Sequence, residues 1–576
     1  MKKIIIIVLI LLAVICGGFI YIKYNFLKTK DFKPDNSKAK TILDLRPAII
    51  AKLQQLVKDG SGGLYILSIE KIDPDLLSSK LDVLGGTISI DTSAMLQLDQ
   101  LKKLPDDVFH IKFHSLHIDG IGINDLLNKR NIDITAAYLN DPVINIYHKA
   151  RPYNKEERKK NDSLTLYQRL MGQMKKIVID SIHINHGIFI IHDVEQHNRT
   201  TKFNDVTVRM SDVLIDSSTQ YETNRFLFAK HATLETSNYI FPTPDSLYLV
   251  KLGKINLAGE EHTVTILNAQ LQHRGSKQEF EKKLPGRDEM YDVFFPKIVL
   301  SGVNWWDLLN KEKILSKKTD IYGGTVSVFY DKSLPVGPLQ SIHHFPHQLV
   351  MMIPVPVLVS ELKFHHLKVI YLQYNPETRS PGTATFTNIN GYARHITNIP
   401  AEIKRSRYTV LSASGLFMNK VPLTARFKFD LLKHRTGQFT ADVHMDTLNK
   451  NIINPITEPL GRFNVKNGQM QEGTVHLEGD NYNLHATINF YYTDLHITPL
   501  KTDSANGGLK KSHLKSFFAN IIFIKNANPQ GTELRQPTVT VGRDHHQNFV
   551  AYIWSTIVTG LLKTVGIPLK LVKKDK

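Results

Sequence analysis

The chain has 576 residues, a formal net charge of +18 and a single cysteine, Cys16. A hydrophobic content of 42% excludes a largely disordered chain, and one cysteine excludes both an intrachain disulfide and a cysteine-based metal site. The basic residues are spread along the chain without a nucleic-acid-binding motif. Anionic lipid headgroups are therefore the acidic partner that this charge favours, and we expect no nucleic-acid partner.

One long apolar run stands at the N-terminus. It covers residues 4–22, which at about 1.5 Å per residue is long enough to cross the hydrocarbon core of a bilayer. We predict a single-pass transmembrane anchor with the body of the protein exported. The alternatives are a cleaved signal peptide and a lipoprotein signal at Cys16, and each reading places the body in the cell envelope. The predicted anchor is represented by Ile4, Ile10, Phe19 and Ile22.

The segment after a polar linker predicts one helix followed by many strands. Residues 41–58 have the apolar periodicity of an amphipathic helix, which the glycine-rich residues 60–63 would end. Further along the chain, short runs such as residues 87–91 alternate between apolar and polar side chains. Such alternation gives a sheet one apolar and one polar face, as in antiparallel sheets. Loops or excursions from the sheet are predicted at residues 277–285, 335–356 and 375–381.

An internal repeat organises the body. Each copy predicts a strand, a glycine turn, a short turn or helix at the sequence Asp-Leu-Leu-Asn, and further strands. The body is therefore predicted to consist of similar β units, each in contact mainly with its neighbours. The ungapped match joins residues 113–120, 125–129 and 144–146 to residues 295–302, 307–311 and 326–328, and a third, partial copy joins residues 85–90 to 323–328.

The C-terminus predicts a short helix with a lysine-rich tail, at residues 551–571. Gly560, Gly566 and Pro568 interrupt it, which argues against a second membrane span. The helix would either dock onto the end of the sheet or contact a membrane surface. The predicted division of the chain is an anchor at 1–28, a linker and helix at 29–63, the repeated body at 64–450, a C-terminal β region at 451–550, and the terminal helix and basic tail at 551–576.

The sequence contains no recognisable catalytic or metal motif. Several of its 25 histidines cluster, as at His343, His344 and His347, but none of the clusters has the spacing of a known metal site. A phosphate-binding loop, a dinucleotide fingerprint and a nucleophile elbow are absent from the sequence. We therefore predict no catalytic residue, cofactor or metal. Trp305 and Trp306 are interpreted either as an interfacial anchor or as buried packing residues.

These features together resemble the AsmA-like envelope proteins of Gram-negative bacteria. Besides the anchor and the repeated strands, the resemblance rests on residues 139–147, 468–475, 490–497, 520–524 and 528–529. It implies an inner-membrane protein with its body in the periplasm, and a long apolar β-groove that carries or bridges phospholipid and supports outer-membrane homeostasis. The implied partners are phospholipids, the inner membrane, and outer-membrane or envelope proteins at the C-terminal end.

The resulting expectation is a mainly β fold: an elongated, repeating antiparallel β-groove with an N-terminal transmembrane helix and short flanking helices. Two other functions remain open, namely a structural scaffold of the envelope with a closed core, and a glycan-binding or glycan-hydrolysing protein whose carboxylates are far apart in the sequence. The polarity and accessibility of the sheet interior distinguish these functions. The residues expected to line the groove are Ile88, Ile90, Ile144, Ile146, Val326 and Val328.

Overall fold

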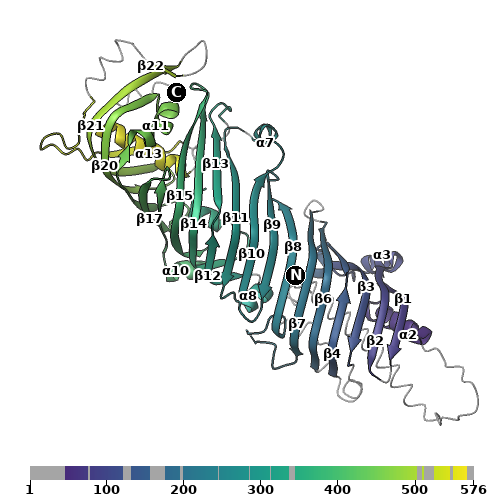
Figure 1. Cartoon of the computed structure of the whole chain (residues 1–576). Helices are drawn as coiled ribbons and strands as arrows, with labels where there is room; N and C mark the ends of the chain where they lie inside the picture. The colour runs from purple at the N-terminus through teal and green to yellow at the C-terminus, as the bar shows by residue number, and fades with distance from the viewer. Residues whose placement is uncertain are drawn as a thin grey trace, which may run out of the picture. The chain divides into compact units, whose positions relative to one another are not determined.

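The computed structural model describes residues 46–566, apart from residues 76–77, 121–130, 156–175, 195–198, 223, 244, 285, 312, 337–343, 503–508, 512–523 and 545–548. In these residues the protein is mainly β, as predicted (Figure 1). The predicted anchor, residues 4–22, lies outside them, and no helix in the described part is both long and apolar enough to cross a membrane. The chain divides into two compact units. Unit 1 consists of Met1–Phe241, Leu252–Ile266 and Gly302–Glu312, and unit 2 of Pro242–Lys251, Leu267–Ser301 and Lys313–Lys576.

Unit 1 begins with helix α2 (Arg46–Gly60), which packs against the first strand. Its buried residues Ile49, Leu53 and Val57 recur every four positions and therefore lie on one face of the helix. The amphipathic helix predicted at residues 41–58 is thus confirmed over its described part. The elements that follow are β1 (Tyr65–Asp75), β2 (Lys80–Ile90), α3 (Thr92–Gln100), β3 (Asp107–Asp119), β4 (Asn131–Asn140), β5 (Val143–His148), β6 (Lys176–Asp193), β7 (Arg199–Ile215) and β8 (Ala229–Pro242).

Strands β4 and β5 form one interrupted line between β3 and β6. Both pair antiparallel with β3 and parallel with β6, whereas the pairs β1–β2, β2–β3, β6–β7 and β7–β8 are antiparallel. A parallel pair needs a crossover connection, which the chain between His148 and Lys176 supplies. The predicted purely antiparallel sheet is therefore wrong at this point, because alternation along a strand does not specify the direction of its neighbour.

The same arrangement recurs in unit 2. Strand β11 pairs antiparallel with β12 and β13, both of these pair parallel with β14, and β14 pairs antiparallel with β15 (Figure 1). Ser115 faces Asn140 in unit 1, and the repeat-equivalent residues Lys297 and Tyr322 face each other in unit 2. The predicted sequence repeat is thus a structural repeat. The strands concerned are β11 (Glu289–Ser301), β12 (Ile314–Tyr322), β13 (Thr325–Asp331), β14 (Val357–Asn375) and β15 (Ser380–Thr397).

Three shorter predictions concern the connections between these strands. Helix α8 (Trp305–Lys311) occupies the Asp-Leu-Leu-Asn position of the second copy, whereas residues 125–129 of the first copy lie outside the described residues. Of the two readings of Trp305, buried packing is observed, because its indole Nε1 donates to the Gly259 carbonyl at 2.7 Å and its side chain has no exposed surface. Residues 277–285 contain helix α7 (Lys277–Lys283), while strands β9 (Tyr248–Ala258) and β10 (Thr263–His273) are divided between the units.

A β-bulge at the same repeat position bends the sheet of each unit. In β6 the pairing with β7 shifts at His186, whose φ is +53°, and in β14 the pairing with β15 shifts at His366, whose φ is also +53°. The His186 ring bonds Asp205 at 2.9 Å, and the His366 ring bonds Asn388 at 2.7 Å. A bulge bends its strand and increases the local twist, so the bulged pairs curve each sheet towards one face.

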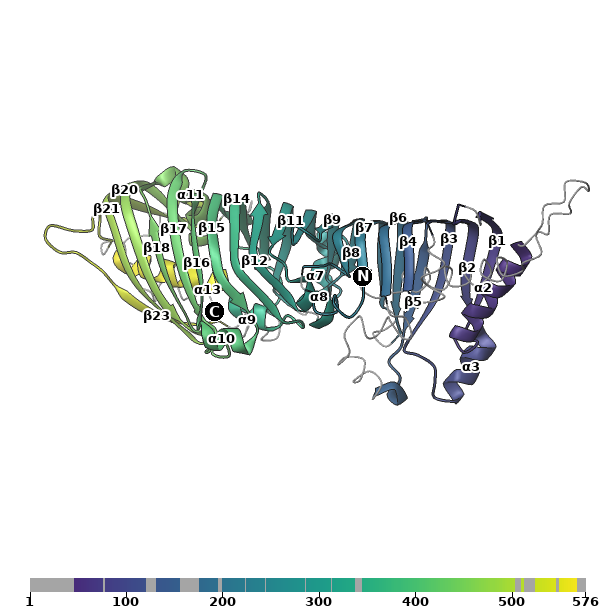
Figure 2. The same ribbon diagram turned by 90° about the horizontal axis from the view of Figure 1, so that it is seen from below.

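The C-terminal part of unit 2 encloses a helix. Helix α13 (Phe549–Thr564) lies on one face of the strands, which we call the inner face of unit 2 (Figure 2, yellow). The helix predicted at residues 551–571 is present over Phe549–Thr564 and docks onto the sheet, but the interruption predicted at Gly560 is wrong, because the helix runs through this residue. The remaining elements are α9 (Pro346–Met351), α10 (Pro400–Arg405), β16 (Tyr408–Phe417), β17 (Val421–Asp430), β18 (Phe439–Met445), β19 (Leu448–Asn449), α11 (Lys450–Ile456), η2 (Thr457–Gly461), β20 (Phe463–Gly479), β21 (Asn483–Thr502), β22 (Leu509–Lys511) and β23 (Thr538–Gly542).

Close packing of α13 depends on Gly560. A Cβ atom at this position would lie 2.1 Å from Cδ1 of Ile488 in β21. Gly560→Val is therefore expected to push α13 away from the sheet and to lower the free energy of unfolding by about 1–3 kcal/mol, the usual cost of overpacking. Urea unfolding followed by circular dichroism measures this change. The exposed Val550 of the same helix supplies the control Val550→Ala, and a Gly560→Val protein as stable as this control would contradict the packing.

The C-terminal core also contains a neutral histidine. The His347 ring stacks on Phe429 at 5.2 Å, is 3% exposed, and neither ring nitrogen has a hydrogen-bond partner in the described chain. Burial lowers the pKa of His347 to about 4. Since an unfolded histidine titrates near 6.5, only the unfolded chain gains this proton between pH 6.5 and 4, and stability falls as the pH falls through that window.

His347→Phe removes this proton and keeps the aromatic stacking. The wild-type protein is expected to lose up to about 3 kcal/mol more stability than the variant between pH 7 and pH 4, from the size of the shift. Urea unfolding of both proteins at the two pH values measures the difference. Parallel losses in the two proteins would show that His347 is not buried in its neutral form.

Candidate functional site

The face of the unit 1 sheet that carries Ile144 is a closed apolar layer, which we call the inner face of unit 1. Ile144 faces Ile111 of β3 and Phe189 of β6 in register, and the three side chains are 0–2% exposed. Of the residues expected to line a groove, Ile144 and Ile146 have no exposed surface and Ile88 is 7% exposed. Ile90 lies apart from them, at the small cluster of Leu64, Leu104 and Val108. Ile88, Ile144 and Ile146 therefore lie in packed layers, and Ile90 is half-buried beside one.

The equivalent layer of unit 2 keeps part of its surface accessible. Val326 of β13 faces Val293 of β11 and Val369 of β14, and Val369 faces Phe386 of β15. All four side chains are half-buried. In unit 1 the equivalents Ile111, Ile144 and Phe189 are buried, whereas Phe203, the equivalent of Phe386, is half-buried as well. We call Val293, Val326, Val369 and Phe386 the apolar row. Of the two predicted lining residues here, Val326 belongs to this row and Val328 is 8% exposed in the neighbouring row.

The apolar row leads into the core around α13. The Phe386 ring lies 5.3 Å from the ring of Phe417 in β16, and Phe386 packs against the buried cluster that contains Phe417 and Tyr552 of α13. The row is therefore open over β11–β15 and closed by α13 over the following strands (Figure 2). An apolar surface that is accessible over four strands can hold apolar ligand groups without any chemical step.

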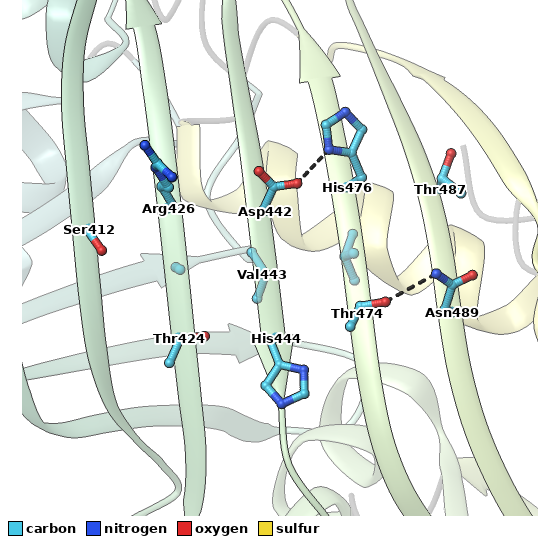
Figure 3. Close-up of a pocket in the computed structure, with 12 residues that line it drawn as sticks. Ser412, Thr424, Arg426, Asp442, Val443, His444, Thr474, His476, Thr487 and Asn489 are labelled. Carbon is cyan, nitrogen blue, oxygen red and sulfur yellow. Dashed lines mark hydrogen bonds and ion pairs between the residues drawn. The ribbon is translucent and has the colours of Figure 1, made fainter.

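The opposite, outer face of unit 2 is polar over β16–β21. A depression of about 410 Å³ over β16–β21 is lined by Ser412, Thr424, Arg426, Asp442, His444, Thr474, His476, Thr487 and Asn489 among others (Figure 3). The His476 ring bonds Asp442 at 2.6 Å, and this bond raises the pKa of His476. Within the described ranges no group of three or more metal-ligating side chains is placed to hold a metal ion. The outer face thus presents cross-strand polar pairs to water.

A second outer depression of about 400 Å³ contains the carboxylates Asp430, Glu478 and Asp480. Arg407 Nε lies 3.0 Å from both oxygens of Asp430. Burial acts to raise the pKa of Asp430, but the hydrogen bond and charge of Arg407, together with the backbone N–H groups of Lys433 and Leu432, outweigh it and the pKa is lowered. A general acid for glycoside hydrolysis needs a raised pKa. The lowered pKa of Asp430 keeps it ionised in its ion pair with Arg407 and does not suit it to that role.

One group on the inner face was not predicted. Glu289, at the start of β11, is 5% exposed, and burial raises its pKa to about 8. The hydroxyl of Tyr291 donates to Oε2 of Glu289. Alternation supplied the only signal in the sequence, since Glu289 and Tyr291 are two residues apart and therefore point to the same face as Val293.

Comparisons with known proteins do not place the chain in a family. No protein-family description and no curated protein matches the sequence. One solved structure that was compared, of a Sex pheromone staph-cAM373 precursor, is similar over 62% of this chain and 96% of its own chain. Its sequence identity is 6% and its TM-score is 0.09, a similarity that carries no argument about fold or function.

Proposed function

We propose that the protein is a membrane-anchored envelope protein that holds phospholipid acyl chains on the inner face of its sheet and so carries phospholipid through the periplasm. The observation that supports this most is the apolar row, in which Val293, Val326 and Val369 are half-buried where the repeat-equivalent residues of unit 1 are buried. The partly accessible row is suited to contact with a ligand.

Further features agree with this function. Acyl chains need only an apolar surface, so neither a catalytic residue nor a cofactor is required. Over β16–β21 the outer face carries polar pairs such as Asp442–His476, which are not suited to acyl chains. The apolar run at residues 4–22 and the resemblance to AsmA-like proteins favour the inner membrane as the place of anchorage.

A second function rests on unit 1. Its inner layer around Ile144 and Ile146 is fully buried, which favours a structural scaffold with a closed core in that part of the chain. The two functions differ in one measurable quantity, the amount of bound lipid. A scaffold binds none, whereas a lipid carrier retains lipid through purification.

The test is extraction of the purified full-length protein with organic solvent, followed by mass spectrometry of the lipids. We expect at least one phospholipid per protein molecule after the detergent has been exchanged for one without phospholipid. A second sample, treated with a lipid-removing resin and then mixed with vesicles, should take phospholipid up again. Absence of phospholipid from both samples would leave the scaffold as the function.

A further inference from the structure

A polar cluster lies next to the apolar row on the inner face of unit 2. Glu289 lies four residues before Val293 in β11, on the same face of the strand, and is opposite Tyr330 of β13. Tyr291 lies between them on the same face and is paired with Val328 of β13. Val328 is in turn paired with Tyr371 of β14. Three tyrosines from three adjacent strands therefore surround one carboxyl group at the end of the apolar row.

The carboxyl group of Glu289 has no compensating positive charge. The groups that act on it are the hydroxyl of Tyr291 and the neighbouring carboxyl of Asp288, and no cation contributes to the pKa of Glu289. The hydroxyl of Tyr248 donates to the backbone carbonyl of Glu289 at 3.3 Å and leaves the carboxyl group itself unpaired with charge. An acid that is buried in this way stays protonated at neutral pH. Buried acids with a raised pKa cluster at functional sites, which makes Glu289 a candidate for ligand binding.

A second observation also indicates a missing partner. The hydroxyl oxygen of Tyr371 is buried and has no hydrogen-bond partner among the residues that the structure describes. Buried hydroxyl groups in proteins are nearly always hydrogen-bonded. The cluster therefore combines an uncompensated carboxyl group, an unused hydroxyl group and several aromatic rings in one place.

These three features suit a ligand that carries an ammonium group. An ionised carboxylate forms charge-assisted hydrogen bonds with ammonium, and the faces of aromatic rings attract cations. We propose that Glu289 and the tyrosines Tyr291, Tyr330 and Tyr371 form a headgroup subsite for the ammonium group of a phospholipid whose acyl chains lie on the apolar row. This inference rests on the proposed function and adds the class of lipid.

Binding at this subsite releases one proton. The neutral carboxylic acid of Glu289 loses its proton to solvent, and the resulting carboxylate pairs with the ammonium group, so the net charge of the filled site is zero. Since burial raises the pKa of Glu289 to about 8, this release becomes easier as the pH rises towards 8. The other titratable or charged groups near Glu289 are Tyr248, Arg287, Asp288, Tyr291, Tyr330, His344, Tyr371 and Asp544.

The experiment offers the lipid-depleted full-length protein a choice of two lipids. Vesicles contain equal amounts of phosphatidylethanolamine and phosphatidylglycerol with the same acyl chains, and mass spectrometry gives the ratio of the two lipids bound to the re-isolated protein. At pH 7.5 we expect about a tenfold enrichment of phosphatidylethanolamine, the effect of one charge-assisted contact of about 1.4 kcal/mol. Glu289→Gln should abolish the enrichment and leave the total amount of bound lipid unchanged.

The controls separate this inference from the proposed function. Glu361→Gln, which removes the charge of Glu361 of β14 from its ion pair with Arg394 of β15, should keep the enrichment. The wild-type protein alone should show a larger enrichment at pH 8.5 than at pH 6, which tests the subsite even when Glu289→Gln does not fold. Lipid bound without enrichment, an enrichment independent of pH, or a folded Glu289→Gln protein that keeps the enrichment would overturn the headgroup subsite alone. A wild-type protein that binds neither lipid would overturn the proposed function as well.

Discussion

Replacing Val326 and Val369 together by aspartate is expected to abolish phospholipid binding. The two residues face each other in the pair β13–β14 and form the middle of the apolar row. Acyl chains in contact with them would have to strip water from two carboxylates, which costs several kcal/mol for each unpaired charge. Because both side chains are half-buried, the free protein can hydrate the new carboxylates and remain folded. The bound phospholipid per protein, measured by mass spectrometry, should fall at least tenfold.

The neighbouring residues supply a matched control on the outer face. Ser327 and Ile370 face each other in the same pair of strands and, one position further along, point to the opposite side of the sheet. Replacing both by aspartate adds the same two charges to the same two strands. This control protein should bind as much phospholipid as the wild type. Equal losses in the two double variants would trace the effect to strand pairing, and unchanged binding in both would contradict a lipid site on the inner face.

Phe345→Ala is expected to produce the largest loss of stability by a single substitution. The Phe345 side chain has no exposed surface, and its ring contacts the rings of Phe439, Phe549 and Tyr552 with centroid distances of 5.6, 4.9 and 6.4 Å. The Arg543 guanidinium lies 4.4 Å from the centroid of the same ring. Truncation of a buried phenylalanine costs about 3–5 kcal/mol, because the cavity that remains collapses only in part.

Urea unfolding of the full-length protein measures this loss, with Leu349→Ala as the control. Leu349 lies on α9, four residues after Phe345, and is 48% exposed, so its truncation should change the free energy of unfolding by less than about 0.5 kcal/mol. In the Phe345→Ala protein we also expect α13 to become accessible to proteases, since Phe549 at its first turn loses a packing partner. A Phe345→Ala protein within 1 kcal/mol of the control would show that α13 is held by other contacts.

Local patterns in the sequence predicted the elements well. The period of the apolar residues predicted α2, and the interruption at Gly566, whose φ is +82°, matches the end of α13. The ungapped repeat predicted that residues 295–328, which contain β12 and most of β13, would have the same structure as residues 113–146, which contain β4 and part of β5. The parallel pairs were missed because the alternation of apolar residues in β4 and β5 does not show whether a neighbouring strand is parallel or antiparallel. Their common alignment against β6 depends on the crossover between His148 and Lys176, which no strand pattern encodes.

The candidate site was predicted only in part, for a physical reason. Ile144 and Val326 are equivalent in the repeat and equally apolar, so the sequence gives no reason to separate them. Their burial differs because it depends on what covers each inner face in the folded chain. Glu289 was missed because charged residues are mostly exposed, whereas the strand places Glu289 on the inner face beside Tyr291, where it is buried.

The most direct test of the account is a photo-crosslinking comparison of two adjacent residues in β13. A photoreactive phenylalanine analogue is introduced at Val326 on the inner face or at Ser327 on the outer face of the full-length protein in its native membrane, and adducts are identified by mass spectrometry after irradiation. The proposed function predicts phospholipid adducts at position 326 and none at position 327. Adducts absent from position 326, or equally abundant at both positions, would contradict it.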